Sequence, residues 1–230
     1  MTPREAEQAP IRTESIEVRR TALFASLGPE PGPAVNEVWY VLHGQGMRAV
    51  PFLDTCRAIE NSTRLIVAPE ALSRYYEGPI AAQKNAPVVA SWMTRDQRES
   101  EIRDYVRYLD DLHALLARQF GGTTPPVTVL GFSQGGAAAL RWVANGTVKP
   151  SRLIVWASSM APEIDYANDT AIRAPKLTYV CGTRDIYITP KVLDQQLGML
   201  RAANLSHTSV SFEGGHRLDD ATLKRIASEV

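Results

Sequence analysis

Short apolar runs recur along the chain at spacings typical of a sheet whose strands are buried on both faces. The clearest runs are nearly continuous and rich in β-branched and aromatic residues. They cover residues 38–42, 64–68, 127–132, 153–157 and 177–181. A weaker run at 207–212 predicts a further strand. The more polar, alternating segment 15–25 predicts an antiparallel edge strand or hairpin.

A long amphipathic pattern between these runs predicts a helix over residues 95–119, with apolar residues every three to four positions. Thr94 and Gln97 have the spacing of a capping box at its start, and Gly121-Gly122 predicts its end. The remaining stretches between strands are also helix-prone. Because strands alternate with helices, we predict an α/β fold: a doubly wound, mostly parallel sheet flanked by helices on both faces.

A second helix start is indicated at Thr189-Pro190, where a threonine N-cap precedes a proline at the first helical position. The predicted helix carries apolar residues at helical spacing, including Leu193, Leu197 and Leu200.

The composition is that of one sizeable domain without a charge bias. The chain has 230 residues, of which 44% are hydrophobic and 22% charged, with a formal net charge of zero. We therefore expect a single domain over 15–230 after a flexible segment 1–14, with no nucleic-acid partner. The acidic, proline-bearing N-terminus resembles neither a secretory signal nor a transit peptide. No apolar run approaches the ~20 residues that a membrane-spanning helix needs, so we expect no integral membrane association.

The two cysteines, Cys56 and Cys181, fall within apolar patterns. This favours buried free thiols in a reducing compartment over a disulfide, and hence a cytoplasmic location.

Candidate chemistry gathers where predicted strands end. Four such ends stand out: 42–46 (LHGQG), 131–136 (GFSQGG), 182–185 (GTRD) and 214–216 (GGH). The carboxyl ends of parallel strands share one edge of the sheet, which is where ligands bind in open α/β sheets. The sequence therefore predicts that these segments meet at one site.

Ser133 is the candidate nucleophile, because residues 131–135 match the G-x-S-x-G pattern between a predicted strand and a helix-prone stretch. Gly131 and Gly135 would leave room for the tight turn. The alternative is an ordinary glycine-rich turn between a strand and a helix.

A serine hydroxyl needs a neighbouring base, and the chain has four histidines. His216 follows a strand and two glycines, so we predict it as the general base; an exposed loop histidine is the alternative. His113 lies within the long helical pattern and His207 begins a weak strand, which favours structural roles. His43 precedes the glycine-rich turn and is predicted to hold that loop by hydrogen bonds.

Asp185 is the predicted partner of His216, because among the acids between Ser133 and His216 it alone follows directly on an apolar strand. Glu213 is the reserve candidate. The backbone N–H groups of Gln45 and Gln134 are predicted to form the oxyanion hole.

The sequence has none of the usual zinc, P-loop or dinucleotide motifs, so no metal and no cofactor are expected.

These pieces, in this order, resemble the phospholipase/carboxylesterase branch of the α/β-hydrolase superfamily, which includes acyl-protein thioesterases and bacterial carboxylesterases. The branch pattern of L-H-G-x-G, G-F-S-Q-G-G, G-x-x-D and G-G-H stands at the four segments above. The resemblance covers the chain from about Val38 onward, and it implies a Ser133–His216–Asp185 triad with oxyanion donors at Gln45 and Gln134. Many members have an apolar residue at the position of Gln45 and an acid at that of Met47.

The stretch 69–96 only loosely echoes the branch's proline-rich loop. It is long for a connection, so we predict a lid or pocket loop there and otherwise a minimal cap. Candidate substrate-binding residues are Tyr75, Tyr76, Trp92, Met93 and Met160.

We therefore predict a serine hydrolase that cleaves carboxylic esters through an acyl-enzyme intermediate, acting on a small-molecule or lipid ester. A thioesterase or lysophospholipase with the same triad is the alternative within enzymes, and a non-catalytic hydrolase-fold binding protein is the alternative outside them. The segment 15–25 and the short C-terminal helix are candidate packing surfaces for a homodimer.

Overall fold

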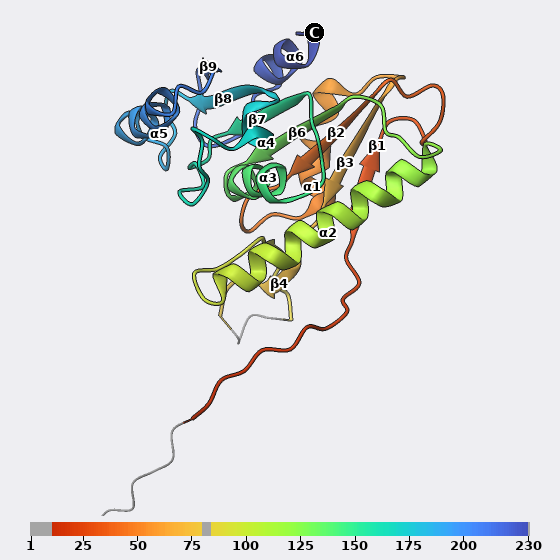
Figure 1. Cartoon of the computed structure of the whole chain (residues 1–230), viewed down its shortest axis with the longest axis vertical. Coiled ribbons are helices and arrows are strands. Elements are labelled where there is room, and N and C mark those ends of the chain that lie inside the picture. Colours follow the sequence, from red (N-terminus) through yellow and green to blue (C-terminus); the bar gives the residue numbers. More distant parts are fainter. Residues whose placement is uncertain (1–10, 80–83, 230) are drawn as a thin grey trace, which may run out of the picture.

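The computed structural model describes residues 11–79 and 84–229, and a seven-stranded sheet with the order β1-β3-β2-β6-β7-β8-β9 forms its centre (Figure 1). The strands are β1 (Phe24–Leu27), β2 (Glu37–Leu42), β3 (Arg64–Pro69), β6 (Val127–Phe132), β7 (Arg152–Trp156), β8 (Lys176–Gly182) and β9 (His207–Phe212). All neighbours pair in parallel except β1, which pairs antiparallel with β3. The strands predicted from the apolar runs are confirmed, as is the α/β class.

The prediction for segment 15–25 is wrong for most of its length, because β1 begins only at Phe24. Phe24 pairs with Pro69, the last residue of β3, so the preceding residues run past the end of their partner strand. Residues 11–23 have no regular structure and are largely exposed. Of the predicted flexible segment 1–14, residues 1–10 lie outside the described part of the chain.

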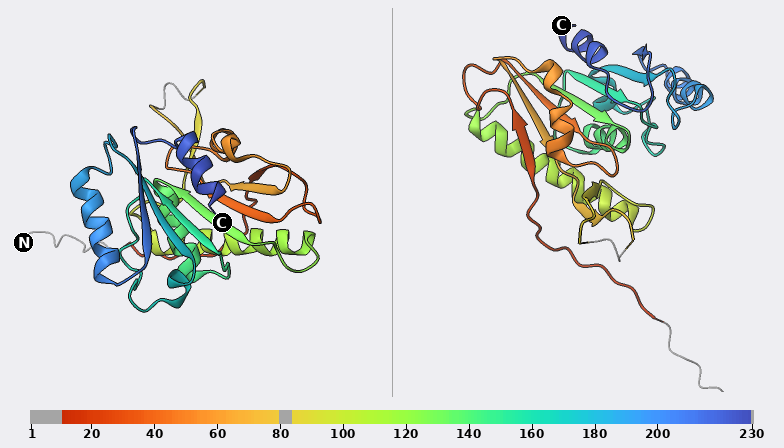
Figure 2. Two further views of the ribbon diagram at one scale, coloured as in Figure 1. Left: turned by 90° about the horizontal axis from the view of Figure 1, so that it is seen from above. Right: turned by 180° about the vertical axis from the view of Figure 1, so that it is seen from behind.

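Helices cover both faces of the sheet (Figure 2). On one face lie α2 (Arg98–Gln119), α3 (Gln134–Asn145), α4 (Thr170–Arg173) and α5 (Pro190–Ala202); on the other lie α1 (Ala49–Asp54), the 3-10 turn η1 (Arg57–Ile59) and α6 (Asp220–Ser228). Alternation along β2 explains the two layers: Val38 and Tyr40 face the α2–α3 side, whereas Trp39 and Val41 face α1 and α6.

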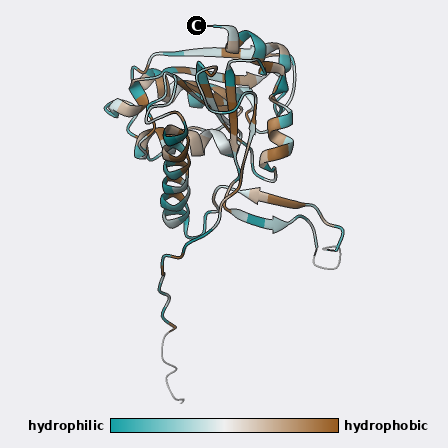
Figure 3. Cartoon of the chain, turned by 90° about the vertical axis from the view of Figure 1, so that its right-hand side faces the viewer, coloured by the Kyte–Doolittle hydropathy of each residue, from teal (hydrophilic) through white to brown (hydrophobic). Residues whose placement is uncertain are grey.

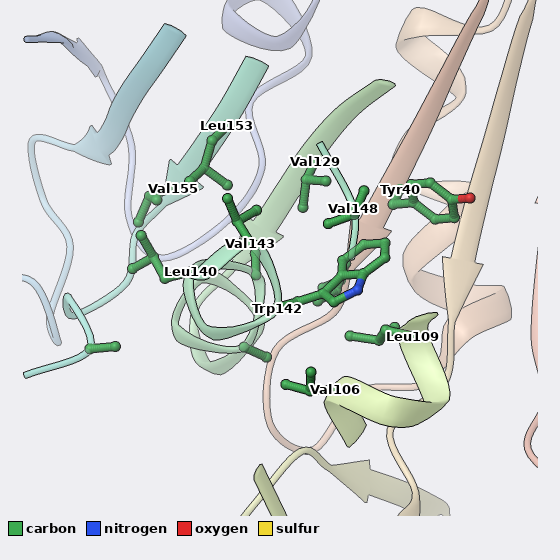
Figure 4. Packing of buried hydrophobic residues seen from close by; sticks show 14 of the residues in the cluster. Tyr40, Val106, Leu109, Val129, Leu140, Trp142, Val143, Val148, Leu153 and Val155 are labelled. Atoms are coloured by element: carbon green, nitrogen blue, oxygen red, sulfur yellow. The ribbon is translucent and has the colours of Figure 1, made fainter. Parts of the chain in front are cut away.

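The α2–α3 side holds the larger core, in which aromatic and branched side chains interlock (Figure 4). Trp142 of α3 meets Tyr40 of β2 edge-on, with ring centroids 5.0 Å apart. Its indole N–H donates to Asp110 of α2 at 2.8 Å, so the polar end of this buried ring is satisfied. These contacts fix α3, which begins directly after Ser133, against the sheet.

The start of α2 differs from its prediction. The helix begins at Arg98, and Gln97 sits at its N-cap in the left-handed region (φ 51°) without a side-chain cap, so the predicted capping box is wrong. Thr94 instead uses its backbone N–H to bind the Glu101 carboxylate at 2.6 Å. The predicted end is confirmed, since Gly122 donates its N–H to the Ala117 carbonyl at 2.8 Å.

The start of α5 and the state of the cysteines match their predictions. Thr189 accepts from the Val192 N–H, and Pro190 is the first helical residue. Cys56 and Cys181 are buried free thiols.

Segment 69–96 contains a two-stranded antiparallel sheet of β4 (Ser73–Tyr76) and β5 (Val88–Ser91). This hairpin projects from the body of the domain in Figure 3. Its tip, residues 80–83, lies outside the described chain. The base of β5 is tied to the sheet edge by a bridge between Ala90 and Met47, so the hairpin starts beside the loop that follows β2.

Candidate active site

The turn between β6 and α3 holds Ser133 in a strained backbone conformation. Its φ is 52° and its ψ −124°, a region that residues other than glycine rarely occupy. The turn is closed by bonds from the Ser133 N–H to the Trp156 carbonyl and from the Gly136 N–H to the Ser133 carbonyl, both 2.9 Å. A Cβ on Gly131 would lie 2.2 Å from the Gly135 carbonyl oxygen, so this turn requires glycine there. The strain and the half-buried position of Ser133 at the start of a helix fit the nucleophile turn that the motif predicts.

The loop after β2 lies against this turn. A Cβ on Gly135 would meet the Leu42 and His43 carbonyl oxygens at 2.2 and 2.5 Å, so the start of α3 contacts the end of β2 directly. A Cβ on Gly44 would lie 3.2 Å from Cβ of Ser133. The backbone of residues 44–46 therefore passes beside the serine.

His43 fastens that loop, as predicted. Its Nδ1 lies 2.7 Å from the Gly44 carbonyl oxygen, and its Nε2 accepts from the Ala71 N–H at 3.0 Å. These partners require a proton on Nδ1 and none on Nε2. Burial lowers the pKa of His43 below its usual value, which favours this neutral form.

Gln134, the residue after the serine, ties a further segment to the site through its side chain. Its amide oxygen accepts from the Trp92 N–H at 2.8 Å and from the Ser91 hydroxyl, and its amide nitrogen donates to the Met93 carbonyl at 2.7 Å. The chain that leaves β5 is thereby fixed beside the serine turn.

His216 and Asp185 form a hydrogen bond between Nδ1 and Oδ2 of 2.8 Å. The carboxyl group of Asp185 is fully buried, and its other oxygen accepts from the N–H groups of Tyr187 and Ile188 at 2.8 and 2.9 Å. The imidazole packs between the rings of Phe132 and Tyr187, with centroids 4.9 and 4.7 Å away. This arrangement holds the ring in one orientation and leaves Nε2 for a partner in the cavity.

Glu213, the reserve candidate, lies at the surface. It pairs with Arg184 at 3.0 Å and accepts from the Thr183 hydroxyl. Among the described contacts of His216 the carboxyl partner is therefore Asp185.

A cavity of about 940 Å³ joins these elements, a size typical of small-molecule sites. Ser133, His216, Gln45 and Gln134 all line it. The other lining residues are Gly44, Gly46, Met47, Tyr75, Glu77, Met93, Arg98, Phe132, Ala137, Arg141, Ala157, Ser158, Ser159, Met160, Pro162, Tyr187 and Ile188.

The structure separates the candidate substrate-binding residues into two groups. Tyr75, Met93 and Met160 line the cavity. Trp92 is buried beneath the loop after β2, where its indole N–H donates to the His43 carbonyl at 2.8 Å, and it borders a different cavity beside α2. Tyr76 is exposed on the hairpin and does not line the site cavity.

Sequence reasoning missed Tyr187 and the two arginines of the cavity wall, Arg98 and Arg141. Tyr187 lies two residues after Asp185 in the same strand-end loop, a signal that was available. Arg141 lies one helical turn after Ala137 on α3, so the face of α3 that meets the cavity would have indicated it.

Neither a metal site nor a membrane-spanning helix is found in residues 11–79 and 84–229. In that part of the chain no three His, Cys, Asp or Glu side chains gather as metal ligands would, and no helix is long and apolar enough to cross a bilayer.

Solved structures with the same architecture include an esterase and an acyl-protein thioesterase. Esterase PE8 superposes with a TM-score of 0.67 at 18% identity, over 90% of this chain and 96% of its own. Acyl-protein thioesterase 2 of Zea mays gives 0.66 at 15% identity, over 90% and 96%. SOBER1 of Arabidopsis thaliana gives 0.63 at 20% identity, over 84% and 96%. This likeness confirms the predicted α/β-hydrolase fold.

A search of curated protein sequences gave no match. A family model described as serine hydrolase (FSH1) matches residues 43–222, a range that runs from the loop after β2 through Ser133, Asp185 and His216. That match covers well over half of the 230 residues. The chain therefore belongs to the serine hydrolase (FSH1) family.

Proposed function

We propose that this serine hydrolase cleaves carboxylic esters through a covalent acyl-enzyme on Ser133. The observation that carries the proposal is the 2.8 Å bond between a fully buried Asp185 carboxylate and His216, an imidazole that shares one cavity with the strained Ser133. A carboxylate on Nδ1 fixes the imidazole tautomer in which Nε2 is unprotonated and free to accept a proton.

In the first half of the reaction, Ser133 Oγ bonds to the ester carbonyl carbon while His216 Nε2 takes the hydroxyl proton. The backbone N–H groups of Gln45 and Gln134 hold the resulting oxyanion. His216 then gives its proton to the leaving alkoxide, the ester C–O bond breaks, and the alcohol departs.

In the second half, His216 takes a proton from water as that water attacks the acyl-enzyme carbonyl. The same proton returns to Ser133 as the carbon–Oγ bond breaks. The net reaction converts an ester and water into a carboxylic acid and an alcohol. Asp185 stabilises the imidazolium form at each step and keeps its own charge.

Turnover assays test the proposal. The substrates are p-nitrophenyl acetate, butyrate and octanoate, with butyryl-CoA and lysophosphatidylcholine as the thioester and lysophospholipid arms. We expect Ser133→Ala to lower kcat by at least about 10³-fold on every substrate that the wild type turns over. Ser209→Ala, which changes an exposed serine of β9, is the matched control.

Wild-type turnover that survives in Ser133→Ala would overturn the proposal. Ligand binding without turnover in the wild type would instead support the non-catalytic alternative. Higher kcat/KM on the CoA ester than on the oxygen esters would assign thioesterase activity to the same triad. The cytoplasmic location and the homodimer stay predictions.

A further inference from the structure

Arg141 places a buried cation in the wall of the active-site cavity. Its side chain is only 5% exposed, yet it lines the same cavity as Ser133. A guanidinium removed from water is costly unless its N–H groups find acceptors. Any N–H group of Arg141 that lacks a good acceptor in the protein is therefore available to an acceptor on a ligand in the cavity.

One nitrogen of the Arg141 guanidinium has a strong hydrogen-bond acceptor, and another has only a weak one. Nε donates to the Glu163 carboxylate, whereas Nη1 has the Met93 sulfur as its partner at 3.5 Å. A thioether is a weak acceptor, so Nη1 is available to a better one. Burial lowers the pKa of Arg141, but its interactions with Glu163 and Tyr105 together outweigh burial and hold the pKa above its usual value, so the group stays charged.

Arg98 adds a second cation at the same wall. It lines the cavity and pairs with Glu163 at 2.8 Å and with the mostly exposed Glu99 at 2.7 Å. Glu163 is thus shared between two arginines. The cavity lining also includes one acid, Glu77 of the hairpin, which is exposed. Because water screens Glu77 and Glu99, the wall around Arg141 and Arg98 retains an excess of positive charge.

The distance from Ser133 suits a short substrate. Ser133 caps α3, and Arg141 lies on that helix, so their Cα atoms are separated by roughly 12 Å along its axis at 1.5 Å per residue. Side chains on a helix tilt toward its N-terminus, which brings the guanidinium back toward the serine.

We propose that the cavity binds esters that carry a carboxylate a few carbon atoms from the scissile bond, with Arg141, assisted by Arg98, as the receptor for that carboxylate. A carboxylate can accept two parallel N–H bonds from one guanidinium, which Met93 cannot. The inference rests on the proposed esterase function and assigns its substrate class. Arg141 and Arg98 act here as specificity residues.

The test compares kcat/KM for charged and neutral esters of matched length. Mono-p-nitrophenyl glutarate is paired with p-nitrophenyl valerate, which places the carboxylate on the acyl part. The butyrate ester of 4-hydroxybenzoate is paired with phenyl butyrate, which places it on the alcohol part. We expect the wild type to favour the charged ester in at least one pair by about tenfold, and the preference to shrink as salt rises.

Variants then connect the preference to the residues. Arg141→Met should lower the charged-to-neutral ratio about tenfold, whereas Glu163→Gln should raise it, because that change removes the competing carboxylate. Arg103→Met, on the exposed side of α2, is the control and should leave the ratio unchanged. If Arg141→Met fails to fold, the charged-to-neutral ratio of Glu163→Gln still tests the inference, because only a rise in that ratio supports it.

A wild type that prefers the neutral ester in both pairs overturns the inference. So does a Glu163→Gln ratio that stays constant or falls, or an Arg141→Met variant that loses both esters equally, as a purely structural tie would. Failure of the proposed function looks different, since none of the four esters would then be hydrolysed. In that case calorimetry of glutarate binding to the wild type and to Arg141→Met tests the carboxylate site without catalysis. Loss of binding in the variant supports Arg141 as the carboxylate receptor, and equal binding overturns it.

Discussion

Replacing Gly135 by alanine should damage both stability and activity, because the start of α3 touches the backbone of β2. The added Cβ would lie 2.2 Å from the Leu42 carbonyl oxygen and 2.5 Å from that of His43. Both neighbours are main-chain atoms of a buried strand end, so neither can rotate away. The helix must move out by about 1 Å, and overpacking of this kind costs about 1–3 kcal/mol.

Two terms set the expected net change. Alanine in a helix is favoured over glycine by about 0.5–1 kcal/mol, which offsets part of the overpacking. We therefore expect Gly135→Ala to lower the free energy of unfolding by about 1–2 kcal/mol, measured by urea denaturation. The same displacement moves Ser133 and the Gln134 N–H relative to the loop after β2. A shift of this size should lower kcat/KM for p-nitrophenyl butyrate by about 10²-fold.

Gly198→Ala is the matched control, because it makes the same change on α5 where the nearest atom is the flexible end of Arg201 at 3.8 Å. It should raise the free energy of unfolding by about 0.5–1 kcal/mol and leave kcat/KM unchanged. A Gly135→Ala protein as stable and active as wild type would refute the close approach of α3 to β2.

Three further changes test other contacts. Asp185→Asn should lower kcat by about 10³–10⁴-fold, because it no longer holds His216 in the productive tautomer; a loss below tenfold in a p-nitrophenyl butyrate assay would contradict that role. Arg64→Met should reduce the free energy of unfolding by about 2–4 kcal/mol, since it removes the 2.7 Å ion pair of a largely buried guanidinium with Glu37; an unchanged urea midpoint would show the pair to be dispensable. Burial lowers the pKa of His43 from 6.5, so as pH falls below that value the unfolded chain takes up the proton first and wild-type stability declines. His43→Gln should show a shallower decline between pH 7 and pH 5 in urea titrations, and an identical slope would count against the neutral, buried imidazole.

The positions of the central strands along the chain could be predicted from the sequence because these strands are buried on both faces. Each then appears as an apolar run that few other structures require. Helix starts were harder, since Thr94 and Gln97 have capping-box spacing, yet the Glu101 carboxylate binds the Thr94 N–H instead. A local pattern cannot reveal which of several nearby partners the folded chain selects.

In the candidate site, too, some residues could be predicted from the sequence and others could not. Residues at strand ends could be predicted to meet, because topology alone brings the carboxyl ends of parallel strands together, and His216 does contact Asp185. Arg141 could not be found by that argument. It lies in the interior of a helix, and its contact with the cavity depends on how α3 is rotated against its neighbours. Trp92 shows the converse, an aromatic residue in the expected segment that packs inward.

The central claim is that Ser133 is a nucleophile activated by His216. Incubation with a fluorophosphonate probe, followed by intact-mass and peptide analysis, tests it most directly. The account predicts a single adduct on Ser133 that is absent from Ser133→Ala and forms at least about 10²-fold more slowly in His216→Ala. A folded wild-type protein that stays unmodified, or that carries the adduct on another residue, would contradict it.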